Sequence, residues 1–138
     1  MLPTKEISRL VQARFTGHES GDPIQVMNVY ADEVEYWDTQ CPERVKGKEG
    51  VARHLTTFLK NYDVRYALLE EHRLEGRDAA IVLWQCAVRR RLSEGRDGSA
   101  IVMQRGMSLL EVRDGLISRD EEYMDLASLQ PLLAIATA

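Results

Sequence analysis

The chain has 138 residues, of which 44% are hydrophobic and 29% are charged, and its formal net charge is −4. This length suits one domain with a sizeable core, so we expect a single domain over residues 1–138. The acidic balance argues against a nucleic-acid-binding protein, because such domains usually carry a basic face.

The two cysteines, Cys41 and Cys86, form no CxxC pair, zinc-ligand spacing or disulfide framework. Both are expected to be free thiols in a reducing compartment. The first residues lack the charged and apolar regions of a signal peptide. Every apolar run falls short of the roughly 18 residues that a membrane span needs. We therefore expect a cytoplasmic protein without a membrane partner.

Helical spacing of apolar residues dominates the first half of the chain. Thr4 is a suitable N-cap residue for the first helix, and Asp22 followed by Pro23 is a typical start for a second. A short alternating segment then predicts a strand, and a loop leads from it to a third helix. In chain order we expect helices over residues 4–18, 23–31 and 48–61, a strand over 33–38 and a loop over 39–46.

After residue 62 the apolar period changes from helical to two, which is typical of half-buried strands. Segments with Gly and Asp separate four long strands, so consecutive hairpins should form an antiparallel meander. These strands are expected over residues 64–74, 79–92, 100–112 and 116–124, with a tail over 126–133 that forms a short helix or covers a sheet edge. A sheet wrapped around helices is an α+β unit and leaves a concavity suited to a ligand.

Two segments of the chain resemble the nuclear transport factor 2-like superfamily. The first, within Tyr30–Tyr62, contains Tyr36-Trp37-Asp38 and Val45-Lys46-Gly47-Lys48-Glu49-Gly50-Val51. The second contains Leu109-Leu110-Glu111-Val112-Arg113-Asp114-Gly115-Leu116-Ile117 and an acid-rich strand ending at Asp125. Within the superfamily, the chain is similar to the SnoaL-like polyketide cyclases and the ketosteroid isomerase-like proteins. The resemblance implies a cone-shaped α+β roll, with a curved, mostly antiparallel sheet wrapped around three N-terminal helices and enclosing one pocket.

Asp38 is the first candidate for a catalytic carboxyl. In ketosteroid isomerase-like proteins, the aspartate that ends the first short strand moves the substrate proton, and the resemblance carries this role to Asp38. Alternation puts Tyr36 on the same face. A carboxylate beside an aromatic ring in an apolar pocket is desolvated, which raises its pKa toward the range of proton transfer. The alternative interpretation is that Asp38 only opens the following loop through an Asx turn.

Glu122 is the second candidate. In SnoaL-like cyclases an acidic residue on the last strand serves as the acid or base of an intramolecular aldol closure. The resemblance favours Glu122 for this role, with Asp120, on the same strand face, as a less buried rival. The alternative is that these acids solvate the outer face of the strand and pair with neighbouring arginines.

Several positions depart from the related enzymes. The tyrosine and the protonated acid of the steroid isomerase oxyanion hole match Arg14 and Ser108 or Met107 here, and one hydroxyl is a weaker donor than that pair. Arg14 could point inward and hold an anion, but an arginine on a first helix more often caps the surface. Limonene epoxide hydrolases use an Asp-Arg-Asp arrangement, and two of its positions fall on Trp84 and Cys86. We therefore do not expect epoxide hydrolysis by that triad.

Other side chains complete the predicted pocket. Tyr36, Gln104 and Ser108 are candidate hydrogen-bond donors to an oxyanion. The candidate wall residues are Trp84, Cys86, Met103 and Met107, of which alternation puts only some inside. Because no metal-ligand spacing and no phosphate-binding glycine loop occur, we expect neither a metal nor a cofactor.

The sequence leaves three functions open. The first is a cofactor-free isomerase or cyclase that moves protons on a small hydrophobic carbonyl compound. The second is a non-catalytic binding protein for an apolar small molecule, and the third is a dimeric scaffold. In each case we expect a homodimer, because alternating strands leave apolar side chains on the outer face of the sheet.

Overall fold

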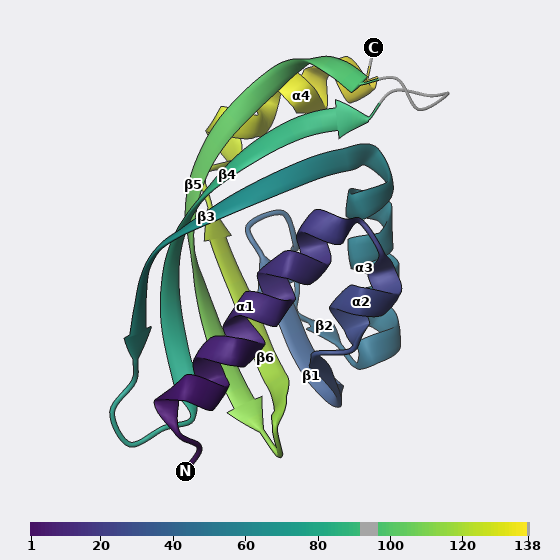
Figure 1. Ribbon diagram of the computed structural model, residues 1–138. Coiled ribbons are helices and arrows are strands. Elements are labelled where there is room, and N and C mark those ends of the chain that lie inside the picture. Colours follow the sequence, from purple (N-terminus) through teal and green to yellow (C-terminus); the bar gives the residue numbers. More distant parts are fainter. Residues whose placement is uncertain (92–96, 138) are drawn as a thin grey trace.

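The computed structural model describes residues 1–91 and 97–137, which form an α+β fold (Figure 1). Within these ranges, the strands form one six-stranded sheet in the order β2-β1-β6-β5-β4-β3. The sheet curves, and β3, β4 and β5 arch over α1 and α3. The elements are α1 (Thr4–Ser20), α2 (Pro23–Met27), β1 (Tyr30–Asp38), β2 (Val45–Lys46), α3 (Lys48–Asn61), β3 (Tyr62–Arg73), β4 (Ala79–Arg91), β5 (Asp97–Arg113), β6 (Leu116–Met124) and α4 (Leu126–Thr137).

The predicted fold class is confirmed, including the meander from β3 to β6. These strands pair antiparallel in sequence order. The pairing of β1 with β6 is parallel, so the sheet is mostly but not wholly antiparallel. The predicted end of the second long strand, residue 92, lies outside the described residues.

The predicted extent of the second helix is wrong. Instead of continuing to residue 31, α2 ends at Met27, and Tyr30 already belongs to β1. The cause is tertiary pairing: the backbone N–H of Ile117 in β6 donates to the carbonyl of Val29 at 2.8 Å, and Tyr30 is the register partner of Ile117. A neighbouring strand thus takes the hydrogen bonds that a longer helix would have used.

The core lies between the concave face of the sheet and the helices. Helical spacing places one apolar stripe of α1 and one of α3 against the sheet, and alternation sends every second residue of β4 inward. Among the described residues, no helix is long and apolar enough to cross a membrane. Buried residues of this core include Ile7, Val11 and Phe15 from α1, Val51, Leu55 and Leu59 from α3, and Ala80, Val82, Trp84 and Val88 from β4.

Gly106 on β5 lets the largest core side chain lie against the sheet. It is the register partner of Trp84 on β4. A Cβ atom at position 106 would lie 2.3 Å and 2.4 Å from two carbons of the Trp84 ring and 2.7 Å from the carbonyl oxygen of Tyr123. Both neighbours are held in place, because Tyr123 contributes backbone and Trp84 Nε1 donates a 2.8 Å hydrogen bond to Ser108 Oγ. The site therefore requires glycine for close approach.

We predict that Gly106→Ala lowers the free energy of unfolding by about 3 kcal/mol, because an overpacked core must displace its neighbours. Gly76→Ala is the matched control. Gly76 has a positive φ of 73° but nothing within 4 Å of an added Cβ, so it should lose only about 1 kcal/mol. Urea denaturation followed by tryptophan fluorescence measures both. Equal losses in the two variants would contradict the proposed contact.

Candidate active site

A cavity of about 380 Å³ lies between the helices and the inner face of the sheet. Aromatic and aliphatic side chains form much of its wall. Two polar groups meet the cavity, each with some members on the wall and others beside or behind them. The Asp38 group consists of Tyr36, Asp38, Cys41 and His54, and the Arg14 group consists of Arg14, Tyr30, Asp120 and Glu122. The lining includes Arg14, His18, Tyr36, Asp38, His54, Phe58, Tyr62, Tyr66, Trp84, Cys86, Gln104, Glu122 and Met124.

Asp38 ends β1 with its carboxyl on the inner face. Its Oδ2 accepts a hydrogen bond from the Tyr36 hydroxyl at 2.9 Å and lies 2.8 Å from His54 Nε2. Its Oδ1 accepts from the backbone N–H of Gln40 at 2.8 Å, which closes the Asx turn of the alternative interpretation. Asp38 therefore opens the loop and also faces the cavity.

The expectation of a raised pKa for Asp38 is wrong. Burial alone would raise it, but hydrogen bonds from His54, the Gln40 N–H and Tyr36 hold the pKa of this carboxyl below its usual value of 3.8. Each of these bonds favours the charged form. Asp38 is consequently an ionised carboxylate at neutral pH.

His54 reaches Asp38 from α3. It stands three residues after Val51 and one before Leu55, beside the buried stripe of this helix. Its ring centroid lies 5.2 Å from that of Tyr36, so the ring rests beside the tyrosine while its nitrogen contacts the carboxylate. The long-range contact between β1 and α3 thus fixes both side chains.

Three potential metal ligands meet in the Asp38 group. Asp38, Cys41 and His54 each offer one donor atom, and these atoms lie within 4.8 Å of one another. Sequence spacing did not indicate this cluster, because it is assembled by the loop after β1 and by α3. Hydrogen bonds within the group already join the three donors: Cys41 Sγ lies 3.4 Å from Asp38 Oδ1 and 3.8 Å from His54 Nε2. We therefore describe the cluster as a hydrogen-bonded group.

Arg14 is the centre of the second polar group. It comes from α1 and is only 1% exposed, so of the two orientations that the sequence left open, Arg14 has the inward one. Its Nε lies 3.1 Å from Asp120 Oδ2 and its Nη2 lies 2.8 Å from Glu122 Oε1. The Tyr30 hydroxyl also donates to Asp120 Oδ2. The groups that Arg14 holds inward are thus the protein's own carboxyls, and the arginine of this acid-arginine-acid group comes from α1 rather than from a strand.

One proton balances the charge of the Arg14 group. Burial, opposed by the charge of Arg14 and aided by Asp120, raises the pKa of Glu122 well above 4.5. Burial would also raise the pKa of Asp120, but Arg14 and the hydrogen bonds from Glu122 and Tyr30 lower it. Asp120 Oδ1 and Glu122 Oε2 are buried, and neither has an N–H or hydroxyl donor within the described part of the chain. A proton on Glu122 supplies the bond between the two carboxyls, and the net charge of the three side chains becomes zero.

The predicted site residues divide between the cavity wall and the layer behind it. Six of them line the cavity, whereas Asp120 and Ser108 lie behind Glu122 and Trp84. The view of Asp120 as the less buried acid is wrong, because Asp120 is 0% and Glu122 2% exposed. Burial raises the pKa of Cys86 to about 12, so its thiol is protonated. The six lining residues are Tyr36, Asp38, Trp84, Cys86, Gln104 and Glu122.

Sequence reasoning missed some lining residues. His18 and Tyr66 face the cavity from α1 and β3. The helical spacing could have indicated that Arg14 and His18 face inward, because they continue the buried positions of Ile7 and Val11 on α1. Their polarity argued against burial, because charged residues are rarely fully buried unless they are paired.

The comparisons with known proteins agree with this fold. The model of the SnoaL-like domain family matches residues 11–120. A proposed isomerase from Bacillus subtilis is 15% identical, with a TM-score of 0.83 over 97% of this chain and 96% of that chain. A proposed polyketide cyclase from Xanthomonas campestris pv. campestris is 21% identical, with a TM-score of 0.76 over 89% and 93%. An LEH-like epoxide hydrolase from M. tuberculosis is 19% identical, with a TM-score of 0.73 over 97% of both chains.

At these identities, likeness to solved structures shows the fold alone. A comparison with curated protein sequences gives no match.

We predict that Arg14→Leu lowers the free energy of unfolding by about 3–5 kcal/mol at neutral pH, because it leaves a buried carboxylate unpaired. The pKa of that carboxyl then rises in the folded state. At a pH above the usual carboxyl pKa, the unfolded variant has lost the proton that the folded variant still holds. The loss in the free energy of unfolding relative to the wild type therefore grows as the pH rises. Urea denaturation at about pH 5 and about pH 8 measures this dependence.

The double variant Arg14→Leu with Asp120→Asn is the control, because it removes the unpaired charge. It should recover much of the stability at the higher pH. If the loss in the free energy of unfolding is the same at both pH values, or if the second substitution leaves it unchanged, Arg14 acts through packing alone.

Proposed function

The chain belongs to the SnoaL-like domain family, and we propose that it is a cofactor-free enzyme of the isomerase or cyclase kind that moves protons on a small hydrophobic carbonyl compound. The observation that carries this proposal is the pair Asp38 and Glu122. Both line the cavity, and their pKa values are displaced in opposite directions. Environments that push two carboxyl pKa values apart are typical of an acid and a base.

The parallel pairing of β1 with β6 brings the two carboxyls together. Asp38 is the register partner of Glu122, and Tyr36 is the register partner of Asp120. Neighbouring strands are about 4.8 Å apart, so side chains at partner positions on one face can contact the same small molecule. The pair therefore belongs to one site.

The charge states suggest a role for each group. Ionised Asp38 accepts a proton from the carbon next to the substrate carbonyl, and protonated Glu122 donates a hydrogen bond to the carbonyl oxygen as negative charge develops there. Asp38 then returns the proton to another carbon in an isomerisation. In a cyclisation, the enolate carbon attacks a second carbonyl, and the new alkoxide takes up the proton. The lowered pKa of Asp38 makes it a weak base, which suits an acidic C–H bond.

The other predicted oxyanion donors are engaged elsewhere, which supports Glu122 in this role. The Tyr36 hydroxyl donates to Asp38, and Gln104 Nε2 donates to the backbone carbonyl of Asp125 at 3.2 Å. Ser108 lies behind the wall, where it accepts from Trp84 and hydrogen-bonds to Glu122.

The cavity wall suits a hydrophobic substrate. Phe58, Trp84 and Met124 contribute apolar surface, and the volume lies in the usual range for small-molecule sites. Both cysteines are free thiols, as predicted, and this is consistent with the cytoplasm as the proposed location.

We predict that the protein accelerates the base-catalysed ring opening of a benzisoxazole, a probe that needs only a carboxylate base in an apolar cavity. Asp38→Asn should lower kcat/KM by about 100-fold or more. Glu122→Gln should retain the rate within a few-fold, because Glu122 already carries a proton. Since the pKa of Asp38 is lowered, the rate should fall only when the pH drops below 3.8.

Equal loss in both variants would contradict the assignment of roles. Folded protein without activity in any variant would refute the enzyme and favour the non-catalytic binding protein or the scaffold.

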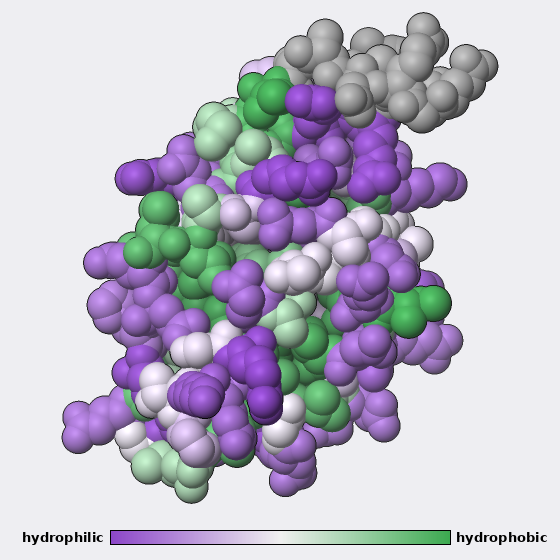
Figure 2. All heavy atoms as spheres, in the orientation of Figure 1, coloured by the Kyte–Doolittle hydropathy of each residue, from purple (hydrophilic) through white to green (hydrophobic). Residues whose placement is uncertain are grey.

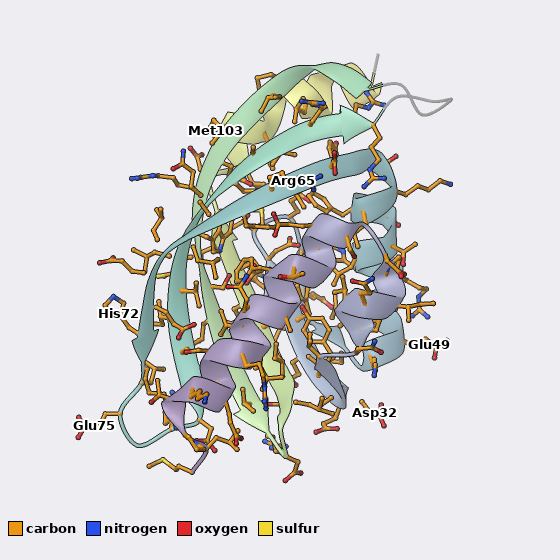
Figure 3. All side chains as sticks on the ribbon, viewed as in Figure 1. Asp32, Glu49, Arg65, His72, Glu75 and Met103 are labelled. Carbon is orange, nitrogen blue, oxygen red and sulfur yellow. The ribbon has the colours of Figure 1, made fainter. Side chains whose placement is uncertain are left out.

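The outer face of the sheet supports a second proposal, that the protein is a homodimer. Ile101 and Met103 on β5 are 54% and 53% exposed, and Met107 on the same face pairs in register with the exposed Tyr123. Met103 lies on the side of β5 that faces away from α1 and α3 (Figure 3). By contrast, the face seen in Figure 2 is mainly hydrophilic, with hydrophobic residues in smaller patches. An apolar strip on one face suits contact with the same strip of a second copy.

We predict that the wild type elutes with twice its mass of 15.7 kDa and that Met103→Lys shifts it toward the monomer. A lysine in the strip would bury a charge at the interface. Ile24→Lys is the control, because Ile24 is 71% exposed on α2 rather than on the sheet. Size exclusion with light scattering gives the masses. A monomeric wild type, or an equal effect of both substitutions, would refute the interface.

A further inference from the structure

His18 takes no part in the chemistry proposed above, yet it faces the same cavity. It lies in the last turn of α1, is 3% exposed and lines the cavity one helical turn after Arg14. Its Nδ1 lies 2.9 Å from the backbone carbonyl oxygen of Arg14. This contact within the helix fixes the orientation of the ring.

The Arg14 carbonyl also fixes the protonation of the ring. A carbonyl oxygen only accepts hydrogen bonds, so Nδ1 must carry a hydrogen and donate it. Burial and the positive charge of Arg14, against the carbonyl bond and the weaker effect of Asp120, lower the pKa of His18 to about 3. The imidazole is therefore neutral, with its hydrogen on Nδ1 and a lone pair on Nε2.

The lone pair on Nε2 has no donor among the described residues. The ring of Tyr66 meets the His18 ring edge-on, with centroids 6.4 Å apart. His18 itself lines the cavity. Because Nδ1 is held by the Arg14 carbonyl, Nε2 is the ring nitrogen left to meet a ligand. A neutral acceptor in a fixed orientation faces the ligand space.

We propose that His18 Nε2 accepts a hydrogen bond from a hydroxyl group of the ligand, which makes His18 the residue that distinguishes hydroxylated ligands from ethers and hydrocarbons. A ligand without a donor leaves the buried acceptor unpaired, and sites built around such a bond reject analogues that lack it. The positive charge of Arg14 disfavours an ammonium donor at the same place. This inference deepens the proposed function, because it rests on the same cavity holding the substrate.

Asp38 is the competing acceptor in the cavity, and the experiment must separate the two. Its carboxylate already receives bonds from Tyr36, His54 and the Gln40 N–H. His18 Nε2 receives none from the described residues. A ligand hydroxyl at His18 therefore gains a partner without displacing one.

The test compares the binding of 2-naphthol and 2-methoxynaphthalene, followed by quenching of tryptophan fluorescence, since Trp84 lines the cavity. The wild type should prefer the naphthol by about 5- to 10-fold. His18→Phe keeps an aromatic ring but removes the acceptor and should abolish the preference. Asp38→Asn should retain it. Preference lost in Asp38→Asn and kept in His18→Phe, or a wild type that binds neither probe, would overturn the proposal.

A measurement on the wild type does not depend on the stability of any variant. Nitrogen-15 NMR of the histidine rings should show His18 as the tautomer protonated at Nδ1, with its Nε2 resonance shifted by the naphthol and not by the ether. A His18 ring protonated at Nε2, or an equal shift with both probes, would contradict the proposed role of His18. Both experiments measure binding without turnover, so their failure is distinct from the absence of benzisoxazole ring opening.

Discussion

The ion pair between Arg14 and Asp120 is the interaction on which the rest of the structure depends. It joins α1 to β6 across the core, and both side chains are buried. The single positive charge of Arg14 is balanced by the carboxylate of Asp120, and Glu122 beside this pair keeps its proton. The same arginine lowers the pKa of His18, while its backbone carbonyl sets the hydrogen position of that ring. Burial is the main cause in both groups: together with the charge of Asp120 it keeps the proton on Glu122 against the charge of Arg14, and together with the charge of Arg14 it keeps His18 neutral.

The contrast between the two cavity carboxyls arises from their depth and from their hydrogen-bond donors. Both have little exposed surface, but Glu122 lies deeper than Asp38, and burial raises the pKa of each carboxyl. Asp38 receives hydrogen bonds from its own strand, from the following loop and from α3. Glu122 lies beside another acid and shares a hydrogen bond with it. The sheet topology then makes the two carboxyls neighbours, because β1 pairs with the last strand of the meander.

Local sequence patterns predicted the elements well and the electrostatics poorly, for physical reasons. Alternation identified β4 and β6, and helical spacing identified α1 and α3, because burial of one face creates those periods. The pKa of Asp38 depends on His54, 16 residues away in sequence and brought near only by the fold. The sequence left the orientation of Arg14 open, because its partner Asp120 is 106 positions distant. The resemblance to known families located the acids, but charge states depend on tertiary contacts that no short pattern contains.

The contact between Gly106 and Trp84 also constrains how this cavity could change during evolution. A side chain at position 106 meets the indole ring, whereas a smaller residue at position 84 would widen the cavity and free that space. Substitutions at the two sites are therefore epistatic, and their order matters. Replacing Trp84 first removes the contacts that an added Cβ at position 106 would make with the indole ring and leaves the one with the carbonyl oxygen of Tyr123 at 2.7 Å, whereas the reverse order meets both and passes through a more overpacked intermediate. Replacing Trp84 also removes the donor to Ser108, so each such step would alter the surroundings of Glu122.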